Sequence, residues 1–165
     1  MNIFLLDKPC DISTIAQSHC DKHVSKMILE SAQMLCTASW LSGITASYRP
    51  VHQKHPCTLW VSASKQNWLW LQELTLKLNE EFCWRYGRSA NHKSADVVKG
   101  MTVPDTLPST SSLAHPQCIP DQYRVIDNPV SAYRNYYLNE KRFAVWTKRE
   151  AVSYTHLTLP TKRIV

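Results

Sequence analysis

The chain has 165 residues, the size of one ordinary domain with a single hydrophobic core. Apolar residues make up 44% of it and charged residues 19%, which is typical of a globular protein and excludes an extended disordered chain. Its three glycines are too few for a turn-rich all-β fold or a glycine-rich phosphate-binding loop, and its net charge of +6 permits a nucleic-acid partner without requiring one.

The first seven residues form a short apolar stretch, in which residues 3–6 are predicted to be extended. No basic residue precedes this stretch and it is too short to cross a bilayer. We therefore expect no signal peptide, no membrane partner, and a location in the cytoplasm of a bacterial or phage-infected cell.

The six cysteines include no C-x-x-C pair. In the absence of an export signal we expect them to be reduced thiols, some of them buried, although their even number formally allows three disulfides. They are Cys10, Cys20, Cys36, Cys57, Cys83 and Cys118.

Two long helices are predicted in the first half of the chain, after a helical turn at residues 13–18. The first spans residues 19–41. The second spans residues 56–86, because Pro56 is favoured at a first helical position and Gly87 ends the helix. Each has a core-facing side, so the two are expected to pack together. The core-facing positions are Cys20, Val24, Ile28, Ser31 and Leu35 in the first helix and Trp60, Leu71, Leu74, Leu78 and Phe82 in the second.

Residues 88–127 lack helical periodicity and are rich in proline and serine, which predicts a long loop that is functional or mobile. Asn128 and Pro129 then begin a third helix. Its aromatic positions are Tyr133, Tyr136, Tyr137, Phe143 and Trp146. The predicted fold class is all-α: two long packed helices plus a third, aromatic-rich helix, in a single domain of residues 1–151.

The last residues, 152–165, are expected not to be native. The run Val-Ser-Tyr-Thr-His-Leu-Thr-Leu-Pro-Thr at residues 152–161 resembles one translated reading frame of an adapter used in sequencing libraries. Lys162 and Arg163 then account for two of the six net positive charges.

The candidate catalytic side chains form a line of polar residues on the first long helix. His19, His23, Lys26, Glu30 and Gln33 are spaced by three, four and seven residues, so they share one helical face. They offer a carboxylate for acid–base work or for stabilising a cationic intermediate, an amine one turn away, and two imidazoles. A polar stripe opposite an apolar one is also typical of any surface helix, and Lys26–Glu30 is an ordinary ion pair. Both interpretations stay open at this point.

A metal site is a third interpretation. His19 and His23 have the i,i+4 spacing of two zinc ligands on a helix, with Glu30 or a cysteine as a third ligand, which would suit a metal-dependent hydrolase. However, no glutamate directly follows His19, and no second His/Cys pair stands at ligand spacing. We therefore predict neither a metal nor a cofactor.

The same helix resembles a known family. Asp21 and His23, followed by Glu30, match the spacing of an Asp, a His and the catalytic Glu in the pyrimidine-dimer DNA glycosylases, the family of phage endonuclease V. Lys26, Glu30, Gln33 and Leu35, followed by His55-Pro56 and Trp60, also resemble small bacterial proteins grouped with that enzyme.

The resemblance spans most of residues 1–150. It implies an all-α fold that binds duplex DNA, flips a nucleotide out and cleaves its glycosidic bond. In that family the amine of the chain's N-terminus attacks the sugar, and the glutamate stabilises the intermediate.

The chain also departs from the family at three positions. The family exposes a small residue after removal of Met, whereas the bulky Asn2 is expected to keep Met1 in place. Leu29 precedes Glu30 where the family has an arginine, and Gln33 stands where it has another. Lys26 is a possible replacement for the amine if burial lowers its pKa.

These observations predict a DNA-base-processing protein, and the alternative is a non-catalytic nucleic-acid-binding phage accessory protein on the same scaffold. We expect Glu30 to lie in a cleft beside His23, Lys26 and His55, and duplex DNA to be the partner. The predicted catalytic residues are Glu30, Lys26 and His23, and the predicted substrate-binding residues are Asp21, Gln33, His55, Lys22, Lys54, Lys93 and Arg124.

Overall fold

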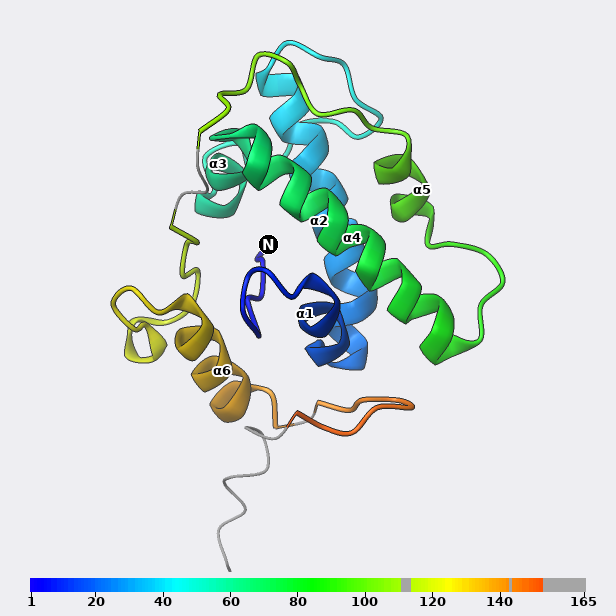
Figure 1. Cartoon of the computed structure of the whole chain (residues 1–165), viewed down its shortest axis with the longest axis vertical. Coiled ribbons are helices and arrows are strands. Elements are labelled where there is room, and N and C mark those ends of the chain that lie inside the picture. The colour runs from blue at the N-terminus through cyan, green and yellow to red at the C-terminus, as the bar shows by residue number, and fades with distance from the viewer. Residues whose placement is uncertain (111–113, 143, 153–165) are drawn as a thin grey trace, which may run out of the picture.

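The computed structural model describes residues 1–110, 114–142 and 144–152, and the regular secondary structure of these residues is helical (Figure 1). The predicted all-α fold is confirmed. The helices are α1 (Ile12–Ser18), α2 (Asp21–Leu41), α3 (Pro56–Ser62), α4 (Lys65–Tyr86), α5 (Lys93–Lys99), the 3₁₀ turn η1 (Asp121–Tyr123) and α6 (Pro129–Glu140). No helix in the described part of the chain is long and apolar enough to span a membrane.

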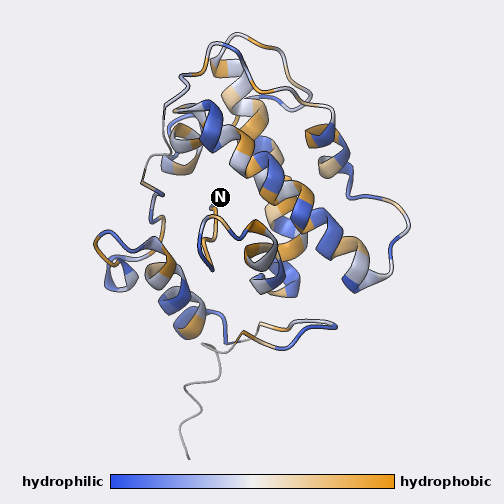
Figure 2. Cartoon of the chain, viewed as in Figure 1, coloured by the Kyte–Doolittle hydropathy of each residue, from blue (hydrophilic) through white to orange (hydrophobic). Residues whose placement is uncertain are grey.

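The two long helices, α2 and α4, pack against each other as predicted, with α3 and α5 against α2 and α1 against α4. Apolar and polar positions are interleaved along both long helices, as in amphipathic helices (Figure 2). Val24, Ile28 and Leu35 of α2 are fully buried, as are Leu71 and Leu78 of α4.

The helix predicted at residues 56–86 is two helices, α3 and α4, separated at Ala63 and Ser64. Ser64 has extended backbone angles, and its hydroxyl accepts a hydrogen bond from the Asn67 N–H. The Asn67 amide in turn donates to the carbonyl of Trp60 in the last turn of α3. Side-chain hydrogen bonds thus satisfy backbone groups on both sides of the break.

The segment of residues 88–127 is not loop throughout, because it contains α5 and η1. The side chain of His92 accepts a hydrogen bond from the Ser94 N–H at the start of α5, and Ala95 and Val98 are buried. A seven-residue helix with two buried apolar positions is too short to produce a recognisable helical period.

The helix α6 ends at Glu140, so Trp146 lies beyond it, and Phe143 is outside the described residues. Tyr137 and Trp146 are both buried. Tyr137 contacts His23 in the first turn of α2, and the Trp146 indole donates to the carbonyl of Ser18 at the end of α1.

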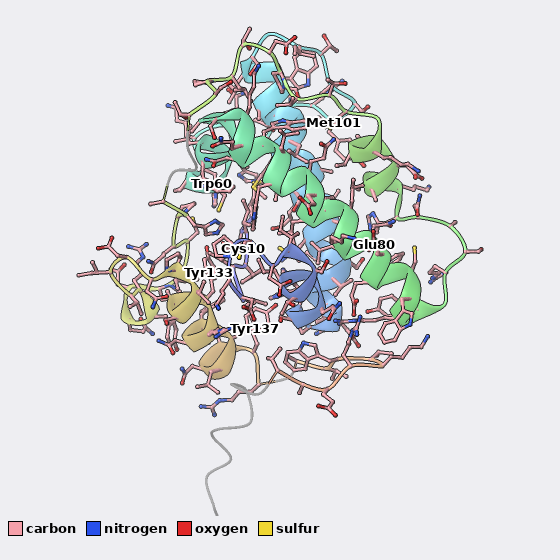
Figure 3. The ribbon with its side chains drawn as sticks, viewed as in Figure 1. Cys10, Trp60, Glu80, Met101, Tyr133 and Tyr137 are labelled. Carbon is pink, nitrogen blue, oxygen red and sulfur yellow. The ribbon has the colours of Figure 1, made fainter. Side chains whose placement is uncertain are left out.

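The N-terminal segment is part of the core, and Figure 1 shows it between α1 and α6. Residues 3–6 are nearly inaccessible to solvent. Figure 3 shows Tyr133 and Tyr137 on α6, and both rings contact Phe4 edge-on. Val152, the last described residue, is partly buried, and the rest of the proposed adapter sequence lies outside the described residues.

Candidate active site around Glu30

Glu30 stands in the middle of α2, where only 12% of its side chain is exposed. One carboxylate oxygen, Oε2, accepts a hydrogen bond of 3.1 Å from the Asn2 N–H and lies 3.6 Å from the amino nitrogen of Met1. The other oxygen, Oε1, lies 3.6 Å from Nζ of Lys26. The carboxylate therefore has one amine beside each of its oxygens.

The side chain of Asn2 holds the N-terminal segment in this position. Its amide donates to the carbonyl of Cys118 at 2.9 Å, and its Oδ1 accepts from the hydroxyl of Tyr133 at 2.7 Å. One residue further, His115 Nε2 donates to the carbonyl of Ile3 at 2.9 Å. The position of the amine is thus fixed from α6 and from the chain before η1.

The two amines differ in their surroundings. The Met1 side chain is 4% exposed, although the residue as a whole is only half-buried, and the Lys26 side chain is 63% exposed. Glu30 and the Met1 amine are both close enough to His55 to affect its charge. Burial, together with the positive Met1 amine, lowers the pKa of His55 against the opposing effect of Glu30, which favours the neutral imidazole.

His19 and His23 do not lie on an exposed polar face, so the predicted stripe is wrong at these two positions. His19 precedes α2, is fully buried, and donates from Nδ1 to the carbonyl of Ile15. His23 is buried in a stack with Phe4, their ring centroids 4.4 Å apart, and its Nδ1 bonds the hydroxyl of Tyr137. The N-terminal segment and α6 cover this side of α2.

Both histidines are neutral at pH 7. Burial is the main cause, and it lowers the pKa of His19 to about 4 and that of His23 to about 3. The group of potential metal ligands found in the described ranges consists of His55, Cys57 and Cys118, and it does not include His19 or His23.

Asp21 fixes the start of α2. Its carboxylate accepts hydrogen bonds from the backbone and hydroxyl of Thr147 and from the guanidinium of Arg85 at 3.0 Å. Burial alone would raise the pKa of Asp21, but these bonds outweigh it and hold the pKa below its ordinary value. Asp21 therefore joins three separate parts of the chain.

The predicted DNA-contacting residues are dispersed. Lys54 is exposed next to His55, and Arg124 is exposed with an ion pair to Asp121. Lys93 begins α5, which Figure 1 shows on the opposite side of α2 and α4 from η1 and α6. Lys22 is exposed in the first turn of α2, and Gln33 is half-buried one turn after Glu30.

An aromatic cavity of about 250 Å³ lies along the N-terminal segment. Trp60, Trp70 and His115 form its aromatic walls, and Leu5 contributes from the segment itself. Figure 3 labels Trp60 on α3. A larger cavity of about 610 Å³ lies between the end of α2 and α5, but it is lined by none of the predicted site residues.

Comparison of the chain with models of known protein families, with curated proteins and with solved structures finds no match. The candidate site therefore depends on its geometry. That geometry brings together Glu30, Lys26 and His55, and it adds five groups that were not predicted from the sequence: the Met1 amine, Asn2, His115, Cys118 and Tyr133. The family resemblance drew attention to an N-terminal amine, but no periodicity links these five groups to α2.

Proposed function

We propose that this protein processes DNA bases in the manner of a pyrimidine-dimer DNA glycosylase, with Glu30 as its central residue. The observation that carries the proposal is the pairing of the Met1 amine and the Asn2 N–H with one carboxylate oxygen of a largely covered glutamate. An amine held against a carboxylate is the minimum that such a reaction needs.

In the proposed reaction the amine attacks C1′ of the sugar of a flipped nucleotide. The ammonium form first loses a proton to the Glu30 carboxylate. An N–C1′ bond then forms as the glycosidic C1′–N bond breaks, and Glu30 returns its proton to the leaving base. When the sugar ring opens, a second amine proton passes to the ring oxygen, and the product is a protonated imine between the amine and C1′, with the ionised Glu30 beside its positive charge.

The Met1 amine is the better candidate nucleophile of the two. The Met1 amine is held in place by the Asn2 contacts, whereas Lys26 projects into solvent. We assign Lys26 the role of an ion-pair partner that helps to position the carboxylate.

Other features suit a DNA substrate. A flipped base is commonly held between aromatic side chains, and the cavity lined by Trp60, Trp70 and His115 offers such walls. Lys54 precedes His55, and Arg124 is close enough to Cys118 to influence its charge. These two cations are therefore the best placed of the predicted set to contact phosphates beside the site.

Borohydride trapping on duplex DNA with an abasic site tests the proposal, because it requires no knowledge of the natural base. An imine reduced by borohydride leaves a covalent protein–DNA adduct. We expect the adduct with the chain that begins at Met1, and also with Lys26→Gln and the matched control Lys22→Gln. A chain with residues added before Met1 should form none.

Absence of an adduct with every form of the protein would overturn the proposed chemistry. Binding to duplex DNA, measured at several salt concentrations, then separates the remaining possibilities. One outcome is an affinity that falls as the salt concentration rises, with a slope of log affinity against log salt concentration that is smaller by about 0.9 for each of Lys54→Gln and Arg124→Gln. This outcome indicates a non-catalytic DNA-binding protein. Failure to bind duplex DNA at low salt would remove the nucleic-acid interpretation.

A further inference from the structure

Three side chains with metal-ligating atoms meet beside the N-terminal segment. His55 and Cys57 stand at the start of α3, and Cys118 comes from the chain before η1. One ligand atom of each lies within 4.8 Å of the others, and the two sulfur atoms are 3.6 Å apart. Cys57 is fully buried, and the other two residues are half-buried.

We propose that His55, Cys57 and Cys118 bind one Zn²⁺ ion. Two cysteines and one histidine are an established zinc ligand set. With Zn–S distances of about 2.3 Å, two sulfur ligands of a tetrahedral ion are roughly 3.8 Å apart. The observed separation of 3.6 Å is close to this value and well above the roughly 2.05 Å of a disulfide bond.

The thiols are suited to binding a cation. The Cys57 thiol donates a hydrogen bond to the Cys118 sulfur, so the two sulfur atoms already face each other. Both thiols lose their protons to solvent as the ion binds, since zinc ligands must be deprotonated. A Zn²⁺ ion with two thiolates and a neutral imidazole carries no net charge, so it does not repel the nearby Met1 amine.

His55 must exchange one interaction for the metal. Its Nδ1 now accepts a hydrogen bond of 3.1 Å from the Cys57 N–H at the start of α3. If Nδ1 is the ligand, its lone pair goes to zinc; if Nε2 is the ligand, Nδ1 carries the proton. In both cases Nδ1 can no longer accept the hydrogen bond from the Cys57 N–H, so this bond is lost when the metal binds.

The site would connect α3 to the segment that holds Asn2, because the Cys118 carbonyl accepts from the Asn2 amide. An oxygen for the remaining tetrahedral position is also near, since Asn2 Oδ1 lies 3.9 Å from the sulfur of Cys57. The inference depends on these contacts alone and is independent of the proposed DNA chemistry.

Metal titration of the reduced full-length chain tests the proposal. Co²⁺ should produce sulfur-to-cobalt charge-transfer absorption, and Zn²⁺ should displace it in a ratio of one ion to one chain. Cys118→Ser removes one sulfur ligand. His55→Asn removes the imidazole but leaves a side chain that can still cap α3. We expect each to weaken Zn²⁺ binding on the order of 100-fold or more, since losing only an outer-shell partner costs about 10- to 100-fold.

Two matched controls should bind Zn²⁺ like the unchanged chain. His92→Asn alters a histidine that caps α5 in the same way, and Cys10→Ser alters an exposed thiol. The absence of a cobalt–thiolate band in the reduced chain would overturn the proposal. So would Zn²⁺ binding that survives both Cys118→Ser and His55→Asn in folded protein, or a reduced chain that binds no Zn²⁺ and forms a Cys57–Cys118 disulfide in air.

Discussion

Glu30 has a different partner at each carboxylate oxygen, and the consequences of this can be tested with one isosteric change. Glu30→Gln keeps the shape and an oxygen that can accept from the Asn2 N–H, but removes the negative charge. Because the charge accepts the proton and stabilises the intermediate in the proposed reaction, we expect borohydride adduct formation to slow by about 10²- to 10⁴-fold. The rate of adduct formation on abasic DNA measures this.

The control for this change is Glu80→Gln on the exposed side of α4, where the carboxylate forms an ion pair with Lys77 (Figure 3). It should leave adduct formation unchanged. Thermal unfolding of both variants separates a chemical effect from a loss of folding. Adduct formation at the normal rate by folded Glu30→Gln would contradict the role assigned to the carboxylate.

At the same scale, sequence alone selected Glu30 and Lys26 correctly as neighbours, because i,i+4 geometry is local to one helix. It placed His23 on the wrong side, because burial depends on what covers the helix. Phe4 and Tyr137 come from other segments of the chain, and no sequence pattern indicates that either residue contacts α2. Pairings of this kind are set by tertiary packing, which a helical period does not encode.

Among the elements, the break between α3 and α4 depends on Ser64. Its hydroxyl, fully buried, is the side-chain cap of α4. Ser64→Ala should lower the free energy of unfolding by about 1 kcal/mol, within a range of roughly 0.5–2 kcal/mol for lost caps. Ser62→Ala is the matched control, since that hydroxyl bonds back to the carbonyl of Thr58 and caps nothing. Equal denaturation midpoints for the two variants would refute this role of Ser64.

Arg85 joins the end of α4 to the start of α2. Its guanidinium is fully buried, pairs with Glu81 at 2.8 Å and Asp21 at 3.0 Å, and donates to the carbonyl of His19. Arg85→Met leaves two carboxylates without this partner, so we expect a loss of about 3–5 kcal/mol in the free energy of unfolding. Lys77→Met, which breaks an exposed pair, should cost about 0–1 kcal/mol. Denaturant titration compares the two variants, and similar losses would contradict the role assigned to Arg85.

The element boundaries that could be predicted are those with a local chemical signal. Pro56 begins α3, and Gly87 ends α4 with a left-handed φ of 58°, a conformation that glycine adopts without strain. The break at Ser64 was missed because Ser64 and Asn67 also suit a helix surface, and only their hydrogen bonds show the interruption. The sequence did not predict α5 because this helix is too short to show a recognisable helical period.

For the molecule as a whole, the candidate site could be predicted only in the half that α2 contributes. Tyr133 and Cys118 hold Asn2 from more than a hundred residues away along the chain, and Cys57 meets Cys118 across 61 positions. Contacts between such distant residues leave no spacing rule in the sequence. This is why the sequence did not indicate that Cys118 lies beside His55 and Cys57.

His19, His23 and the half-buried His115 make the stability of the whole fold depend on pH. Burial lowers the pKa of His19 and His115 to about 4 and that of His23 to about 3, from 6.5. Below pH 6.5 the unfolded chain therefore binds protons that the folded protein does not. Stability is complete above pH 6.5 and falls as the pH decreases toward 4, by up to about 1.4 kcal/mol per pH unit for each histidine.

Denaturant unfolding at pH 7, 6, 5 and 4.5 measures this slope. His115→Gln should make it shallower, because glutamine has no titrating ring while its amide can still donate to the carbonyl of Ile3, as His115 Nε2 does. His52→Gln is the control, since that histidine is exposed and its loss should leave the slope unchanged. The pKa values of Asp21 and Glu81 are held below their ordinary 3.8 and 4.5. The stability that these two carboxylates contribute is therefore lost as the pH falls through their lowered pKa values, below the range in which the histidines act. A free energy of unfolding that stays constant from pH 7 to pH 4.5 would mean that these histidines are protonated inside the fold.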